Sequence, residues 1–322
     1  MNATMLRNLA TAIVLSAGLT TASGAFALDD IRIIAPASPG GGWDQTARAM
    51  QEVMQSAGIA KAATVENVSG AGGTVGLAQL ADKEKGNPNV LMVNGLVMVG
   101  AILTNQSAVT LEQTTPIARL TGEYEVIVVP ASSDIQNLGQ LVEKLKADTG
   151  AVAWGGGSAG GTDHILAGLI TQAAGADATK VNYVPFSGGG EALAAIMGGH
   201  VTAGISGIGE WLGQIQAGEL RALAISAPER LPGLEVPTLK EQGVDVELAN
   251  WRAVVAAPGI DDAQKKALAD AVDAMVKSDA WKKVLSDKGW MDLYMPGDEF
   301  TKYLDDENAR VGAILKTLGL VS

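Results

Sequence analysis

The chain has 322 residues, of which 23 are Lys or Arg and 35 are Asp or Glu, so its formal net charge is −12. This acidic balance argues against nucleic acid and anionic membrane surfaces as partners. The chain contains no cysteine, which excludes disulfides and attachment through a lipid-modified cysteine, and it is long enough to bury a large core without cross-links. Two distant histidines and the absence of an H-E-x-x-H motif predict no metal site.

Residues 1–27 have the order of features of a secretory signal peptide. Arg7 supplies the positive first region, residues 9–19 are apolar or small, and Ala25-Phe26-Ala27 matches the small-x-small cleavage pattern. We therefore expect cleavage after Ala27 and a freely soluble periplasmic protein. Loss of Arg7 leaves 22 basic and 35 acidic residues, a formal charge of −13. No later apolar run approaches the ~20 residues that span a bilayer, so no direct membrane insertion is expected.

Short β-rich runs alternate with helical periods along the mature chain, which predicts an α/β fold with parallel sheets covered on both faces. The expected strands cover residues 31–35, 63–66, 90–93, 125–129, 151–154, 182–184, 201–205, 220–225 and 253–257. Two turn-rich stretches, residues 129–134 and 226–233, are typical of crossings between lobes. They predict a discontinuous first lobe of residues 28–129 and 229–322, and a second lobe of residues 130–228.

Four polar, glycine-rich turns are the main functional signal: residues 37–44, 69–74, 154–163 and 186–191. The first, third and fourth stand between an expected strand and an expected helix. Glycine lets the backbone approach a ligand closely, and the first N–H groups of a helix carry positive partial charge. Such sites bind carboxylate or phosphate without a cationic side chain, and none of the four turns contains Lys or Arg. We therefore predict an anion site where these turns meet.

The candidate ligand-binding residues come mainly from these turns. They are Ser38, Pro39, Gly40, Gly41, Gly42, Trp43, Asp44, Gly72, Ser158, Ala159, Gly160, Gly161, Thr162, His164, Ser187, Gly188, Gly189, Ser206 and Arg252. Several have a second interpretation. Asp44, like Asp163, stands at a helix start, where capping also explains an acid. Trp43 serves as a ligand shelf or begins an apolar helix face, and Arg252 binds a carboxylate or forms an internal salt bridge.

Two enzyme motifs need weighing. Residues 156–160 fit the G-x-S-x-G nucleophile elbow, so the alternative function is a secreted α/β serine hydrolase that uses Ser158. Asp177 and His200 follow in the required order, but His200 precedes a strand instead of lying beyond the last strands. Residues 155–160 also fit G-x-G-x-x-G, yet no acid ends the following strand at 182–184, so no cofactor is expected.

The same segments resemble the substrate-binding proteins of tripartite tricarboxylate transporters, the TctC or Bug family. The resemblance lies in residues 36–44, 65–73, 157–164, 183–191, 220–224 and 236–243, in order along nearly the whole mature chain. It implies a type II periplasmic-binding fold: two α/β lobes, a ligand cleft between them and a hinge of two segments. It also implies that residues 38–44, 158–164 and 187–190 hold a ligand carboxylate, partly through waters.

The resemblance further implies function and partners. Members capture a small organic carboxylate and hand it to a membrane permease with large and small subunits, driven by an ion gradient. Trp43 and Arg252 resemble the tricarboxylate-type members, so we expect a citrate-like di- or tricarboxylate. We expect a monomer that has no catalytic activity. Many relatives have Ser-Pro-His where this chain has Thr162-Asp163-His164, which leaves the ligand at that loop open.

Overall fold

The computed structural model describes residues 28–322, and the predicted signal peptide lies outside them. The strands are β1 (Leu28–Ala35), β2 (Ala60–Asn67), β3 (Val90–Gly95), β4 (Thr115–Pro130), β5 (Ala153–Gly156), β6 (Asn182–Pro185), β7 (Ala203–Gly207), β8 (Leu220–Ile225), β9 (Ala249–Ala256) and β10 (Met291–Pro296). The helices are α1 (Gly42–Ser56), α2 (Thr74–Lys83), α3 (Leu96–Thr104), α4 (Leu138–Ala147), α5 (Thr162–Ala173), α6 (Gly189–Met197), α7 (Ile208–Gln216), α8 (Asp262–Lys277), α9 (Asp279–Lys288) and α10 (Gly297–Thr317).

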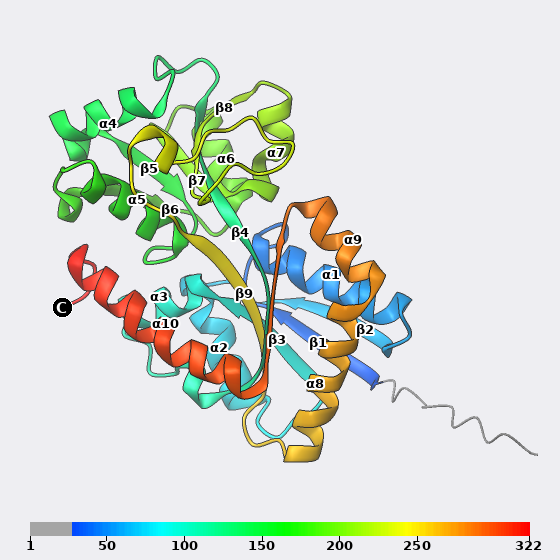
Figure 1. Ribbon diagram of the computed structural model, residues 1–322. Coiled ribbons are helices and arrows are strands. Elements are labelled where there is room, and N and C mark those ends of the chain that lie inside the picture. The colour runs from blue at the N-terminus through cyan, green and yellow to red at the C-terminus, as the bar shows by residue number, and fades with distance from the viewer. Residues whose placement is uncertain (1–27) are drawn as a thin grey trace, which may run out of the picture.

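The strands form a mixed sheet, with order β2-β1-β3-β9-β4-β7-β5-β6 and with β8 and β10 also paired to β4. The outer pairs β1–β2, β1–β3, β5–β6 and β5–β7 are parallel, as the alternation of strands and helices predicts. The expectation of parallel sheets throughout is wrong at the centre, where β3 and β4 pair antiparallel with β9. The reason is visible in Figure 1: β4 runs from one group of strands to the other, and β9 runs back.

β4 belongs to both groups of strands. Its residues Thr115–Tyr124 pair with β9, and from Glu125 onward it pairs with β7. The return path is tied to the same place, because the Glu125 amide donates to Ser226 Oγ at 2.9 Å and the Ser226 hydroxyl donates to the Leu248 carbonyl at 2.6 Å. The change of partners thus falls a few residues before Pro130. The predicted division into residues 28–129 with 229–322 and residues 130–228 stays a prediction.

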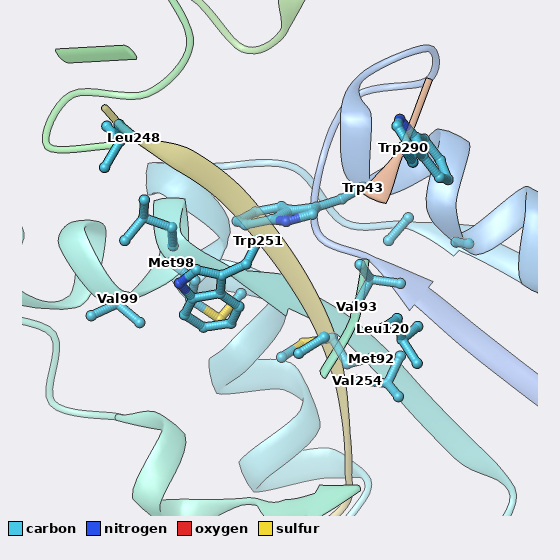
Figure 2. Packing of buried hydrophobic residues seen from close by; sticks show 14 of the residues in the cluster. Trp43, Met92, Val93, Met98, Val99, Leu120, Leu248, Trp251, Val254 and Trp290 are labelled. Carbon is cyan, nitrogen blue, oxygen red and sulfur yellow. The ribbon is translucent and has the colours of Figure 1, made fainter. Parts of the chain in front are cut away.

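Buried apolar side chains pack against the centre of the sheet. Figure 2 shows Trp43, Met98 and Trp251 gathered beside β9. Trp251 is 2% exposed, and its indole N–H donates to the Glu307 carboxylate of α10 at 2.7 Å. A smaller cluster, which includes Ile196 and Trp211, fills the space between α6, α7 and their strands. Within residues 28–322, no helix combines the length and apolar character needed to cross a membrane.

Candidate functional site

A cavity of about 390 Å³ opens where the glycine turns meet β9. It is bordered by the loops after β1, β5, β6 and β7 and by the turn that precedes α2, so it lies at carboxyl ends of strands, where α/β sheets bind ligands. Of the predicted site residues, those that line it are Gly41, Gly42, Trp43, Gly72, Ser158, Ala159, Thr162, Ser187, Gly188, Gly189, Ser206 and Arg252. The structure therefore brings segments that are far apart in the sequence to one cavity.

The remaining predicted residues lie outside the lining: Ser38, Pro39, Gly40, Asp44, Gly160, Gly161 and His164. Asp44 has a structural role, because its carboxylate accepts from the Gly40 amide at 2.8 Å, from Asn67 at 2.8 Å and from Arg48 at 2.9 Å. Burial opposes ionisation of Asp44, but these hydrogen bonds prevail and hold its pKa below the usual value. His164 accepts from the Gly160 amide at 3.1 Å, so both residues are engaged with each other.

The helices that begin at the cavity share one property. The N-caps of α1, α2, α5, α6 and α7 are Gly41, Gly73, Gly161, Gly188 and Gly207, which have no side chain to cap the helix. At α7 the carboxylate of Glu123 accepts from the first-turn Gly209 amide at 3.3 Å. By contrast, α4, α8 and α9 begin away from the cavity and are capped by the side chains of Asn137, Asp261 and Ser278. Glycine thus leaves the first-turn N–H groups uncapped where a ligand has access. This arrangement can receive an anion.

Side chains packed against the glycine loops hydrogen-bond to the backbone of those loops. The Tyr183 hydroxyl donates to the Gly157 carbonyl at 2.9 Å, and the ring of Tyr183 stacks on that of His164 with centroids 4.2 Å apart. The indole N–H of Trp211 donates to the Gly189 carbonyl at 3.0 Å. These two hydrogen bonds fix the positions of Gly157 and Gly189 in their loops. Burial lowers the pKa of His164 to about 4, so this histidine is neutral at physiological pH.

Arg252 is the cationic side chain of the cavity. It is 1% exposed, and its Nη2 is ion-paired with the carboxylate of Glu123 on β4. Its Nη1 is buried and has no hydrogen-bond partner among the described residues. Its guanidinium carbon lies 5.1 Å from the centroid of the Trp290 ring. The internal salt bridge is therefore formed by one terminal nitrogen of Arg252, and the other has no partner among the described residues.

Asn250 lies two residues before Arg252 on β9 and lines the same cavity, as expected from the alternation of a strand. Its Oδ1 accepts from the Thr162 hydroxyl at 3.2 Å, which connects β9 to the start of α5. A hydroxyl and an amide are thereby positioned beside the arginine. Trp43 is 7% exposed, packs in the core and also borders the cavity.

Three acidic side chains also line the cavity: Asp163, Glu191 and Glu210. Asp163 accepts from the Gly157 amide at 2.6 Å, yet burial outweighs this bond and raises the pKa of Asp163 to about 6. Burial, together with the nearby Glu123, raises the pKa of Glu210 to about 8. Behind the lining, burial raises the pKa of the fully buried Glu125 well above its ordinary value. Of the two lining carboxyls with a raised pKa, Glu210 therefore has the higher value and stays mostly protonated at neutral pH.

The sequence did not single out Glu210 or Asn250. Glu210 stands in Ile208-Gly209-Glu210-Trp211, just after the strand that ends beside Ser206, so its position after a strand was the available signal. The structure does not place the acid and histidine expected for the hydrolase motif beside its serine. Ser158 lines the cavity, whereas Asp177 and His200 are exposed and lie outside the lining. Among the described residues, no group of His, Cys, Asp or Glu forms a metal site.

The profile of the tripartite tricarboxylate transporter family receptors matches residues 46–320. The protein BugT of Bordetella pertussis is 27% identical over 294 residues, which cover 90% of this chain and 89% of BugT. MatC of Rhodopseudomonas palustris, solved with bound malate, is 23% identical, with a TM-score of 0.78 and coverage of 90% of this chain and 100% of MatC. A second R. palustris protein, solved with adipate, is 22% identical, with a TM-score of 0.81 and coverage of 90% and 97%.

Both structural likenesses lie below 25% identity and bear on the fold. They agree with the arrangement of strands and helices in Figure 1, and likenesses to other solved periplasmic proteins confirm the predicted two-lobed periplasmic-binding fold. The family match covers the chain from the first helix to the last residues, and it confirms the resemblance inferred from the sequence. This chain belongs to the family of receptors of tripartite tricarboxylate transporters.

Proposed function

We propose that this protein is a periplasmic receptor that captures a citrate-like di- or tricarboxylate and delivers it to the large and small subunits of a membrane permease. Residues 1–27 direct export and are removed after Ala27. The mature chain acts as a monomer, with the lobes 28–129 plus 229–322 and 130–228 closing on the ligand. It performs no catalysis, and no observation favours hydrolysis, because Asp177 and His200 lie apart from the cavity that Ser158 lines.

The observation that carries the proposal is the contrast between helix starts. The helices α1, α2, α5, α6 and α7, which begin at the cavity, have glycine N-caps without a capping side chain. The helices whose N-cap side chains do cap them begin elsewhere, as does α10, which starts after Pro296 without a cap. A carboxylate that accepts from several such N–H groups compensates for the missing caps. Arg252 adds a charged donor at Nη1, which suits a second carboxyl group of the same ligand.

The size of the cavity agrees with a small organic acid. Its 390 Å³ falls at the lower end of the roughly 300–1,000 Å³ that ligand pockets occupy. Malate and adipate, bound by the two R. palustris proteins of the same fold, are both dicarboxylates. Donors on the glycine loops and on β9 lie on different walls, so a ligand with two or three carboxyl groups engages both and favours closure of the lobes.

A thermal-shift screen of residues 28–322 with malate, adipate and citrate tests the proposal. A ligand at a hundred times its dissociation constant should add about 2.7 kcal/mol to the free energy of unfolding. Matched concentrations of sodium chloride control for ionic strength. A melting temperature that no organic acid raises contradicts the proposal, and labelling of Ser158 by a fluorophosphonate favours the hydrolase instead.

A further inference from the structure

Acidic side chains outnumber basic ones at the cavity lining and in the layer directly behind it. Glu123, Glu125, Asp163 and Glu210 gather around Arg252, which is the one Lys or Arg side chain in the cavity lining of the described chain. With all four carboxyls ionised, this group would have a formal charge of −3. That charge would repel the carboxylate that the proposed function requires, so the way these groups are partnered decides what the cavity binds.

Three of the four carboxyls are engaged within the protein or lie behind the lining. Glu123 is ion-paired with Arg252 and accepts from the Gly209 amide at 3.3 Å. Asp163 accepts from the Gly157 amide, and a hydrogen bond from Glu125 also favours its ionised form. Glu125 is fully buried and is absent from the cavity lining. Glu210 is therefore the carboxyl of this group that is left to contact a ligand.

Glu210 lies on the first turn of α7 and lines the cavity. Its Oε2 is buried and has no hydrogen-bond partner among the described residues, as is also true of Nη1 of Arg252. The same Oε2 overlaps the position that a Cβ on Gly189 would take. Ser206 Oγ lies 3.1 Å from that position. The two residues that carry these atoms, one on α7 and one on β9, line one cavity, so a single ligand there can approach both.

We infer that Glu210, in its neutral form, donates a hydrogen bond to a carboxylate oxygen of the ligand held beside Arg252, so that the ligand binds together with a proton. The inference rests on the proposed function and extends it to a residue and a protonation state. A neutral carboxyl is a donor, whereas an ionised carboxyl only accepts, so a single proton turns this group from a repulsive into an attractive one.

The surroundings of Glu210 favour the neutral form. Burial raises its pKa to about 8, and Glu123 and Asp163 act in the same direction, while Arg252 and the nearby Gly189 amide oppose them. The elements packed against α7 supply two further charged groups. Glu191 on α6 accepts from the Ser187 amide at 3.1 Å, and Arg221 on β8 donates to three carbonyls of residues 131–135. Neither is free to pair with Glu210, so the carboxyl keeps its proton near neutral pH.

The direction of the pH effect follows from this assignment. Ligand binding requires the protonated form, so affinity falls as the pH rises through the pKa of Glu210. With a pKa of about 8, the protonated fraction falls about tenfold between about pH 7 and pH 9, and the affinity falls with it. The carboxyl groups of malate, adipate and citrate are largely ionised across this range, so their own titration contributes little.

Calorimetric titration of residues 28–322 with malate, adipate and citrate at pH 7, 8 and 9 and constant ionic strength tests the inference. The dissociation constant of the wild type should rise about tenfold from pH 7 to pH 9. In buffers of different ionisation enthalpy, the wild type should take up protons on binding at pH 8. Glu210→Gln has a permanently neutral donor, so its dissociation constant should change less than about twofold between pH 7 and pH 9. Its proton uptake on binding should vanish.

Glu125→Gln is the matched control, because it replaces a buried carboxyl of the same group that lies outside the lining. It should keep the tenfold rise and the proton uptake. A wild type without pH dependence, a Glu210→Gln variant that keeps it, or a Glu125→Gln variant that loses it overturns the inference while the proposed function stands. Aspartate, an amino acid, could instead bind more tightly at pH 9 and fail to bind to Glu210→Gln. That result would mean that an ionised Glu210 binds the ammonium group of the ligand. Failure of all three acids to bind at every pH overturns the proposed function and this inference with it.

Discussion

Arg252 and Glu123 form a buried ion pair across the two central strands, with the Nη2 of the arginine on the carboxylate and its Nη1 left without a partner at the cavity. Glu123 also accepts from the Gly209 amide, so one carboxylate positions both the arginine and the start of α7. Such a pair costs desolvation energy and adds little net stability. Its benefit is positional: the arginine is held rigid and already desolvated before a ligand arrives.

Replacing Arg252 separates its structural role from its binding role. Arg252→Gln leaves Glu123 buried without its cation, so the free energy of unfolding should fall by about 3–5 kcal/mol. The double variant Glu123→Gln/Arg252→Gln removes both charges and should recover most of that loss. Its ligand affinity should remain lower by about 1.5–3 kcal/mol, since the charged hydrogen bond is missing. Urea unfolding and calorimetric titration measure the two effects, and a double variant with wild-type affinity would show that Arg252 does not contact the ligand.

Gly42 leaves space for the guanidinium of Arg252. A Cβ added at Gly42 would collide with it, so Gly42→Ala should displace the arginine and cost about 1–3 kcal/mol through overpacking. Gly213→Ala, on α7, is the matched control because a Cβ there meets nothing within 4 Å. The control should bind normally and gain stability, by up to about 1 kcal/mol, from its helix propensity. Equal affinities of the two variants would argue against a role for this close approach.

Gly100 of α3 contacts the loop before α5. A Cβ at Gly100 would collide with the Gly160 carbonyl oxygen, and these residues belong to different proposed lobes. Gly100→Ala should therefore hold the lobes apart, weaken ligand binding about tenfold and raise the radius of gyration measured by small-angle X-ray scattering. Gly312→Ala, where a Cβ would have only an ordinary contact with Leu103, is the control. An unchanged radius with unchanged affinity would contradict closure through this contact.

Glu125 should destabilise the fold at neutral pH. Its side chain is fully buried, and burial raises its pKa well above the ordinary 4.5 in the folded state. Both states hold the proton below about pH 4.5; above it the unfolded chain loses the proton first, so stability falls by at most about 1.4 kcal/mol per pH unit until the folded pKa is passed. Glu125→Gln removes this loss. Urea unfolding should show equal stability of variant and wild type near pH 4.5 and a more stable variant at pH 8, and parallel pH profiles would disprove the assignment.

The glycine loops could be predicted from sequence because their signal is local. A strand followed by a glycine turn and a helix fixes both the backbone and the edge of the sheet at which it lies. For this reason the sequence predicts one site for residues such as Gly41, Ser158 and Gly188, and the structure brings them to one cavity.

The acidic side chains around Arg252 could not be predicted, because burial of a carboxyl depends on contacts distant in sequence. Glu210 reads as a solvated residue of a short helix, and Glu123 lies in residues 115–124, where a proline, an arginine and a glycine weaken the strand pattern. Tertiary pairing with β9 overrides that weak propensity and extends β4 to 16 residues. The edge strand β10 was missed for a similar reason, since its residues are only partly buried.

The central claim is that N–H groups at glycine-capped helix starts, together with Nη1 of Arg252, hold a carboxylate ligand. A crystal structure of residues 28–322 with the organic acid that most raises the melting temperature tests it directly. The account predicts ligand oxygens within hydrogen-bond distance, directly or through one water, of amides in residues 41–43, 158–162 and 188–189 and of Arg252. A ligand seated elsewhere, or held in this cavity with those amides turned away from it, would contradict the account.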